Sequence, residues 1–343
     1  MTSISIKGAA LLSVRVVFAF ICLSSVRSRT WKSPTIDSLQ DGVIPASPDL
    51  EYLEVLPPAD SNSSGCNTTI QVRKIPGLGG STRTHGAWDG LAVHVEGCWF
   101  THHDDDANTP FRVLSPPGGC TSSSGGLGYT SSDALSHGCD VAINGSPFGK
   151  KGGCLGQSMS GGNRVCDDCS VWEGIPSFGL ISPTVRNGGK ENGDAIHSTW
   201  AIGTGLSYEM AQSMGIKDLL VGHVPGWLVR SGVALPEAGG AAAPRTALGV
   251  SKDGRALTVL VVDGCEHCPR IMGGPQGLTV ADVAAEMIKL GAFHAINLDG
   301  GGSSALFHDG DIQNFPTSFD VAPIRKERKV STVLCLKGAD IDH

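Results

Sequence analysis

The chain has 343 residues, of which 40% are hydrophobic and 17% charged, so it can bury the core of one large domain or two smaller ones. Its formal net charge of −7 argues against the clustered basic surface that binds nucleic acid, and we expect no nucleic-acid partner. The 47 glycines and the low aromatic content of 6% indicate many turns and a strand-rich body.

The first 28 residues have the features of a secretory signal peptide. Lys7 supplies a positive charge, the apolar run from Val16 to Leu23 follows, and small serines come next. An uncleaved anchor is the alternative, but this run is shorter than the ~20 apolar residues that cross a bilayer, so we expect no membrane span after cleavage. Residues 29–80 are interpreted as a linker or pro-region with little structure, and residues 81–338 as the folded domain.

The cysteines also indicate export to an oxidising compartment. Ten follow the proposed signal peptide, an even number that predicts disulfides: Cys66, Cys98, Cys120, Cys139, Cys154, Cys166, Cys169, Cys265, Cys268 and Cys335. The two CxxC pairs among them also fit a zinc site with four thiolate ligands, although nearly a hundred residues separate the pairs. We expect disulfides, with no bound metal and no cofactor.

Two sequons for N-glycosylation, at Asn62 and Asn67, lie in a polar stretch and agree with export. A third begins at Asn144, but its apolar neighbours predict burial, so we expect it to stay unmodified. The polar run His102–Asp106 suggests a metal-binding cluster, but such a run is more typical of a solvated loop.

Three apolar strands end in polar residues that are followed by glycine. Asn144 follows the strand Val141–Ile143, Asp263 follows Leu257–Val262, and Asn297 and Asp299 follow Ala292–Ile296. Polar groups at the ends of buried strands are a common way to build a site on a rigid frame. Each of these residues alone also fits an ordinary turn, and the recurrence of the pattern favours a site.

A helix is predicted between the second and third of these strands. Thr279 can cap it with Asp282 three residues later, and Gly291 ends it. Its apolar face consists of Val280, Val283, Ala284, Met287 and Ile288. The two strands and this helix predict a right-handed βαβ unit with parallel strands. Glu286, near the middle of the helix, is a weaker catalytic candidate, because such a residue is usually solvated.

The sequence Asn297-Leu-Asp-Gly-Gly-Gly-Ser-Ser304 is the most distinctive in the chain. Asn297 and Asp299 point to the same face of a strand. Gly300, Gly301 and Gly302 let a ligand approach the backbone and can direct N–H groups at an anion. With the hydroxyls of Ser303 and Ser304, the turn suits a sugar or a phosphate. Together the elements predict an α+β fold, with a mixed β-sheet core, flanking helices and long disulfide-linked loops.

Several of these motifs together resemble the phosphodiester glycosidase family. They occur in the family's order over about residues 85–337: Asn144-Gly145 with Phe148, Gly153-Cys154-Leu155-Gly156, Arg245-Thr246-Ala247-Leu248-Gly249, Val262-Asp263-Gly264, Asn297 to Ser303, and Val330-Ser331-Thr332-Val333. One motif departs from the family pattern, because Asn144 begins Asn-Gly-Ser-Pro-Phe where the family commonly has Asn-Gly-Gly-Phe-Phe.

The resemblance implies hydrolysis of a sugar-1-phosphodiester, most directly removal of GlcNAc from GlcNAc-α-phosphomannose to expose mannose 6-phosphate on glycoproteins. The partner would be a phosphoglycan or glycoprotein substrate, in the Golgi lumen or outside the cell. Two alternatives remain: a hydrolase of a phosphodiester-linked exopolysaccharide, and a secreted glycan-binding protein without turnover. The sequence leaves the oligomeric state open.

The residue types fit this chemistry in distinct roles. Asp299 and Asp263 are the preferred carboxylates, either to activate water or to form a glycosyl intermediate. Arg245 can hold the phosphate through paired hydrogen bonds, with Thr246 beside it, although a surface salt bridge is the alternative. Further substrate-binding candidates are Asn144, Gly145, Asn297, Gly300, Gly301, Gly302, Ser303, Ser304 and Thr332.

Overall fold

The computed structural model describes residues 52–56, 68–78, 88–97, 109–181, 198–235, 240–321 and 324–338. These residues all belong to one compact unit, Ser33–His343. The predicted signal peptide, the sequons at Asn62 and Asn67, and the run His102–Asp106 lie outside the described residues.

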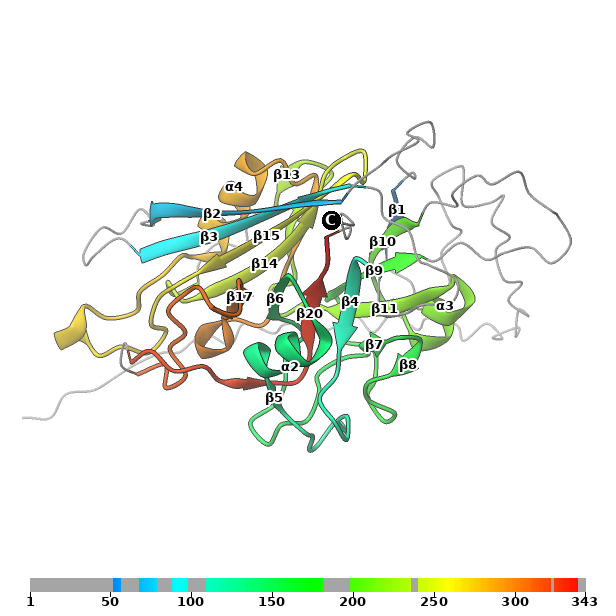
Figure 1. Cartoon of the computed structure of the whole chain (residues 1–343), viewed down its shortest axis with the longest axis horizontal. Helices are drawn as coiled ribbons and strands as arrows, with labels where there is room; N and C mark the ends of the chain where they lie inside the picture. Colours follow the sequence, from blue (N-terminus) through cyan, green and yellow to red (C-terminus); the bar gives the residue numbers. More distant parts are fainter. Residues whose placement is uncertain are drawn as a thin grey trace, which may run out of the picture. The chain divides into compact units, whose positions relative to one another are not determined.

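The described strands form three large sheets and a two-stranded ribbon (Figure 1). The six-stranded sheet has the order β1 (Tyr52–Val55), β10 (Thr199–Thr204), β9 (Pro176–Ile181), β11 (Ile216–Val221), β7 (Met159–Ser160), β8 (Asn163–Arg164). The seven-stranded sheet has the order β13 (Val233–Ala234), β12 (Trp227–Arg230), β16 (His294–Asn297), β14 (Arg245–Val250), β15 (Ala256–Val262), β3 (Trp88–Glu96), β2 (Thr69–Leu78). The five-stranded sheet has the order β18 (Asp311–Ile312), β17 (Leu306–His308), β6 (Val141–Asn144), β20 (Val333–Leu336), β4 (Phe111–Leu114). The ribbon pairs β19 (Lys329–Val330) with β5 (Gly128–Tyr129).

Helices are few in this part of the chain. They are α2 (Thr130–His137), α3 (Tyr208–Ser213) and α4 (Val280–Lys289), with 3₁₀ turns η2 (Arg270–Met272) and η3 (Gly301–Ser303). None of the described helices is long and apolar enough to cross a membrane. The described chain is thus mostly β-sheet, and the expected α+β class fits only in part.

The expected mixed sheet is not seen, because every pairing between the described strands is antiparallel. The predicted βαβ unit is present in modified form. Strands β15 and β16 run in the same direction and α4 connects them, but β14 lies between them and pairs antiparallel with both. The sequence pattern could not show this inserted strand, since β14 precedes the unit in the chain.

One hydrophobic core is shared by the inner faces of all three large sheets. Alternation along the strands builds it: Leu257, Val259 and Val261 of β15 point into this core, whereas Leu260 and Val262 point to the opposite face. The centre of this core is aromatic, with the rings of Phe111, Phe178 and Trp200 contributed by the other two sheets. The three sheets therefore cannot shift independently, which fixes the strand ends that carry the predicted site.

The outer face of each large sheet is covered by one helix. Helix α4 packs on the seven-stranded sheet, α2 on the five-stranded sheet and α3 on the six-stranded sheet. Helix α4 begins as predicted, because Thr279 Oγ1 accepts from the N–H of Asp282 and the Asp282 side chain accepts from the N–H of Thr279. Val280, Val283, Ala284 and Met287 are buried as predicted, but Ile288 is 38% exposed.

The assignment of residues 29–80 to a linker or pro-region needs correction. Strand β2, with ten residues, pairs with β3 along the edge of the seven-stranded sheet, and β1 pairs with β10 at the edge of the six-stranded sheet. The folded region therefore begins well before residue 81. The Pro- and Ser-rich composition between these strands concealed them, because edge strands tolerate polar residues and proline.

The cysteine pattern is resolved in favour of disulfides. Four are present in the described residues: Cys120–Cys154, Cys139–Cys335, Cys166–Cys169 and Cys265–Cys268. Both CxxC pairs are closed locally, so the four-thiolate zinc site is wrong. The disulfides indicate an oxidising compartment. Cys66 and Cys98 lie outside the described residues.

We predict that the four disulfides contribute unequally to stability. Cys139 and Cys335 are 196 residues apart, whereas Cys166 and Cys169 are three apart. The loop-entropy model gives about 5 kcal/mol for the long loop and about 2 kcal/mol for the short one. Replacing Cys139 and Cys335 by Ala should therefore lower the free energy of unfolding in urea more than the same change at Cys166 and Cys169. Equal losses would show that loop entropy does not set these contributions.

Candidate active site

The side chain of Asn144, at the end of β6, joins three of the predicted segments. It is fully buried, and both of its polar groups are bonded. Its Nδ2 donates to the backbone oxygen of Asp299 at 2.6 Å. Its Oδ1 accepts from Thr246 Oγ1 at 2.9 Å and from the N–H of Ala305 at 3.1 Å. The amide thus ties β6 of the five-stranded sheet to β14 and to the turn after β16 of the seven-stranded sheet. Its burial also agrees with the expectation that this sequon stays unmodified.

Gly145 and Ser146 extend this junction to the third sheet. Gly145 accepts from the N–H of Asp299 at 3.2 Å, and an added Cβ would lie only 2.5 Å from Thr332 Oγ1, so no side chain fits. The N–H of Ser146 donates to Thr332 Oγ1 at 2.7 Å, and Ser146 Oγ accepts from the N–H of Val221 at the end of β11. Ser146 occupies the position where the commoner motif has glycine, and here its hydroxyl bonds two sheets together.

The glycine turn is packed closely on all sides. Gly301 adopts φ 59°, and an added Cβ would lie 2.5 Å from Glu266 Oε2. At Gly302 the same addition would approach a guanidinium nitrogen of Arg328 within 2.7 Å. The N–H of Gly301 donates to the Pro244 carbonyl. The N–H of Gly302 makes no hydrogen bond to a described residue, and Asp320 Oδ1 would lie 2.7 Å from a Cβ added at Gly302.

Asp299 is the electrostatic centre of the site. Desolvation is the main cause that raises the pKa of Asp299, to about 6. The Ser303 hydroxyl, the charges of His223 and Arg328, and the N–H of Gly300 oppose this shift. A carboxylate with this pKa is ionised near neutral pH and can still exchange a proton there, as a general base or nucleophile requires.

Three buried polar atoms around Asp299 lack hydrogen-bond partners: Asn297 Oδ1, Ser303 Oγ and Ser304 Oγ. The Ser303 hydroxyl lies near the Asp299 carboxylate without ordinary hydrogen-bond geometry. Buried polar atoms without partners are rare in folded proteins, because each costs about 1–3 kcal/mol. Three of them beside a carboxylate with a raised pKa indicate a site built for a polar ligand.

Arg245, predicted to hold a phosphate, lies beside the glycine turn. Its Cδ would be 3.9 Å from a Cβ added at Gly300. The guanidinium is half-buried and already donates to two backbone carbonyls, from Nε to Leu278 at 3.2 Å and from Nη2 to Ala241 at 2.9 Å. Desolvation lowers the pKa of Arg245, and the charge of Glu266 opposes that shift. Held in this way, the guanidinium keeps further N–H groups for an anion.

Sequence reasoning did not assign Arg328 and His223 to this site. Arg328 forms an ion pair with Asp320 and acts on the pKa of Asp299. It belongs to the basic run Arg325–Lys329, which is typical of a solvated loop. His223 follows β11, and its N–H donates to the Asn297 carbonyl at 2.7 Å. No metal-ligand spacing in the sequence distinguished it from the other histidines.

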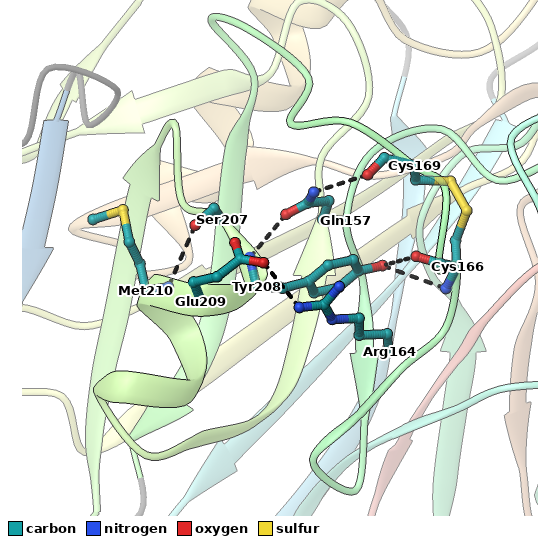
Figure 2. Close-up of polar contacts among 8 residues, drawn as sticks. All are labelled: Gln157, Arg164, Cys166, Cys169, Ser207, Tyr208, Glu209 and Met210. Atoms are coloured by element: carbon teal, nitrogen blue, oxygen red, sulfur yellow. Dashed lines mark hydrogen bonds and ion pairs between the residues drawn. A yellow bond between two sulfur atoms is a disulfide. The ribbon is translucent and has the colours of Figure 1, made fainter.

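An aromatic residue, Trp172, also reaches this area. Its ring contacts His223 edge-on at 6.0 Å between centroids. It follows the Cys166–Cys169 disulfide loop, which helix α3 anchors (Figure 2). Tyr208 Oη donates to the Cys166 carbonyl at 2.7 Å, and Gln157 bridges the Cys169 carbonyl and the N–H of Tyr208. The local disulfide thus helps to position an aromatic side chain beside the site.

The other two predicted catalytic carboxylates have hydrogen-bond or ion-pair partners of their own. Asp263 Oδ1 accepts from Asn314 Nδ2 at 2.9 Å and from the N–H of Phe315 at 2.8 Å, and no described hydrogen bond links it to Asp299. Glu286 forms an ion pair with Lys289 on the same helix at 2.5 Å. Hydrogen bonds and close contacts join Asn144, Gly145, Arg245, Thr246, Asn297, Asp299, the turn Gly300–Ser304 and Thr332. Asp263 is joined to Ser304 of this turn through Asn314, whereas Glu286 pairs with Lys289 within α4.

The described residues offer one grouping of possible metal ligands, Cys166, Asp168 and Cys169. Its two sulfurs are joined in a disulfide, so thiolate ligands are not present there.

We predict that burial of Asp299 destabilises the fold above its pKa. Because the folded pKa, about 6, exceeds the unfolded value of about 3.9, the free energy of unfolding should fall as pH rises from 4 to 6. Asp299→Asn should remove this dependence and be more stable than the wild type at pH 7, by at most about 3 kcal/mol. Urea unfolding between pH 4 and 8 measures this. A variant less stable than the wild type at pH 7 would contradict it.

The geometry agrees with comparisons to known proteins. A sequence model of the phosphodiester glycosidase family matches residues 137–337. The chain is 30% identical over 252 residues to N-acetylglucosamine-1-phosphodiester alpha-N-acetylglucosaminidase of Bos taurus. The matched region makes up 66% of this chain and 42% of the bovine protein. The chain thus spans less than half the length of that relative.

The fold is similar to that of the zebrafish enzyme of the same name, whose catalytic domain was solved auto-inhibited by its pro-peptide. The two share 25% identity with a TM-score of 0.58, over 83% of this chain and 87% of that one. Because the family model covers more than half of the sequence, including Asn144, Asp299 and Thr332, the chain belongs to the phosphodiester glycosidase family.

Proposed function

We propose that the protein is a glycosidase that hydrolyses a sugar-1-phosphodiester, removing GlcNAc from GlcNAc-α-phosphomannose to expose mannose 6-phosphate on glycoproteins. The observation that carries the proposal is Asp299, a desolvated carboxylate with a pKa of about 6 beside a glycine turn and two arginines. Family membership and the names of the bovine and zebrafish relatives support the choice of substrate.

Asp299 has the central catalytic role in this proposal. The bond to be broken joins an anomeric carbon to a phosphate oxygen, and the transition state at that carbon resembles an oxocarbenium ion. An ionised Asp299 stabilises this positive charge, and it either activates water or forms the glycosyl intermediate. Phosphate leaves without strong protonation, so one carboxylate with flanking cations is sufficient. No catalytic role is proposed for Asp263 or Glu286.

The phosphate is proposed to lie at the glycine turn. Arg245 lies beside Gly300 and Arg328 beside Gly302, and the N–H of Gly302 makes no hydrogen bond to a described residue. Two guanidinium groups and a backbone N–H are typical donors for a phosphodiester anion. The sugar would then contact Asn297 Oδ1, Ser303 Oγ and Ser304 Oγ, the buried atoms without partners.

Other residues of the predicted set are proposed to position these groups. The amide of Asn144 is bonded at both ends, and the hydroxyl of Thr246 donates to it. Thr332 Oγ1 accepts from the N–H of Ser146. Because their polar groups are used within the protein, these residues hold the strand ends in place, as Gly145 does, and do not contact the sugar.

The disulfides support an oxidising compartment, and we propose the secretory pathway, with the Golgi lumen or the extracellular space as the place of action. Residues 1–28 would act as the signal peptide, and Asn62 and Asn67 would carry glycans.

We predict that the purified protein releases GlcNAc from GlcNAc-α-phosphomannose and that Asp299→Asn abolishes turnover while the fold survives. The amide keeps the shape of the carboxylate but not its charge or basicity. Sugar release and thermal unfolding of both proteins measure this. Retained activity in the variant would remove Asp299 from the mechanism, and saturable binding without turnover by the wild type would favour a glycan-binding protein.

We predict that Arg245→Ala weakens hydrolysis of the phosphodiester roughly ten- to over a hundredfold, the effect of losing a charge-assisted hydrogen bond. Any hydrolysis of a neutral α-GlcNAc glycoside should change little, because that substrate has no phosphate. Arg164→Ala is the matched control, since Arg164 pairs with Glu209 on the surface. Equal loss on both substrates would mean that Arg245 acts through its bonds to Leu278 and Ala241.

A further inference from the structure

Asp263 borders a pocket that shares no residue with the Asp299 site. Its volume is about 720 Å³, within the range of about 300–1,000 Å³ that is typical of small-molecule sites. Strands β2 and β3 form one wall with Lys74 and Asp89, and the segment after β18 forms the other with Gln313 and Asn314.

One oxygen of the Asp263 carboxylate has no hydrogen-bond partner among the residues that the structure describes. Both hydrogen bonds to Asp263, from Asn314 and from the N–H of Phe315, go to Oδ1. The residue is only 8% exposed, and Oδ2 has no hydrogen bond to any described residue. Desolvation raises the pKa of Asp263, so neither water nor the protein fully compensates for the burial of its charge. An unused acceptor at the floor of a pocket favours a ligand that brings its own donors.

The charges that line the pocket select a neutral ligand. Lys74 is neutralised by Asp89 at 2.5 Å, and Arg325 donates to the Ile312 carbonyl at 2.7 Å. With Asp263 and Asp309, the lining carries three carboxylates against two permanent cations. This balance disfavours a phosphate and suits hydroxyl groups. Phe315 is also among the lining residues, together with the apolar residues Val72 and Leu91.

A single side chain connects this pocket to the glycine turn. Asn314 is buried, and its Nδ2 donates both to Asp263 Oδ1 at 2.9 Å and to the backbone oxygen of Ser304 at 3.0 Å. Ser304 is one of the residues proposed to contact the GlcNAc. The floor of the pocket and the proposed reaction site are therefore parts of one hydrogen-bonded frame.

We propose that this pocket is a saccharide subsite that binds a neutral hexose of the glycan chain carrying the phosphodiester. The inference rests on the proposed function for the identity of the sugar, and it assigns Asp263 to substrate binding through hydroxyl donors to Oδ2. Binding of the glycan chain in this pocket would then add to the affinity that the glycine turn provides for the phosphodiester.

Direct binding tests the subsite without turnover. The probe is a phosphate-free oligomannose glycan, titrated into the full-length Asp299→Asn protein by calorimetry or NMR. We expect saturable binding, weakened about ten- to a hundredfold by adding Asp263→Asn, the effect of losing a hydrogen bond to a charged acceptor. The asparagine keeps an oxygen for Asn314 and Phe315, so the fold should survive, and thermal unfolding checks this. Asp167→Asn, an exposed residue outside the pocket lining, is the matched control.

A kinetic comparison separates this inference from the proposed function. With Asp263→Asn, KM for a phosphodiester on an oligomannose chain should rise at least about tenfold while kcat stays near the wild-type value, and KM for GlcNAc-α-phosphomannose should change little. Failure of the wild type to cleave either substrate would overturn the proposed function, and the binding titration would still decide the subsite. No saturable oligomannose binding, or equal effects of Asp263→Asn on both substrates, would overturn the subsite.

Discussion

The buried amide of Asn144 is the interaction on which the site depends. Both of its polar groups are bonded, and they join two segments that are far from Asn144 in the chain: the strand with Thr246, and the turn from the backbone of Asp299 to Ala305. A buried amide that lost one of these partners would pay the desolvation cost of the group left behind, so the arrangement tolerates little displacement. The position of Asp299 is therefore set by the packing of the sheets and not by the glycine turn that follows it.

The fold supplies the rigidity that this arrangement needs. The three large sheets share one core, and each is covered on its outer face by a single helix. Near the strand ends, Ser146 adds hydrogen bonds to Val221 and Thr332. A rigid set of packed sheets can hold a buried polar or charged group whose desolvation lowers the stability of the fold. The desolvated Asp299 and the unpartnered atoms of Asn297, Ser303 and Ser304 reduce stability, and a reactive site requires that cost.

Features that depend on neighbouring residues in the chain could be predicted from the sequence. The capping box at Thr279, the buried face of α4 and the strand ends at Asn144 and Asn297 all follow from periodicity and turn chemistry. The position of Asp263 relative to Asp299 does not follow from periodicity or turn chemistry. Its strand runs in the same direction as β16, but β14 lies between them, which separates the two strands by about 10 Å at ordinary strand spacing. Only the strand order shows that the strands before Asp263 and Asp299 lie on opposite sides of an intervening strand.

The sequence analysis did not assign Arg328 to the site for a similar reason. Its ion pair with Asp320 is a tertiary contact, and the basic run that contains Arg328 is typical of a solvated loop.

The two carboxylates that the sequence treated as equivalent differ in their surroundings. The charges of Arg328 and His223 act on Asp299, and Arg245 lies beside Gly300, although the carboxylates of Glu266 and Asp320 also lie close to the glycine turn. Asp263 lies among residues that carry more negative than positive charge, which suits neutral hydroxyls. Because Asn314 bonds both Asp263 and the backbone of Ser304, a shift at either site must be accommodated by the other. If the proposed function and the proposed subsite hold, a charged diester on a neutral glycan would use both environments, and the buried side chain of Asn314 joins them through its two hydrogen bonds.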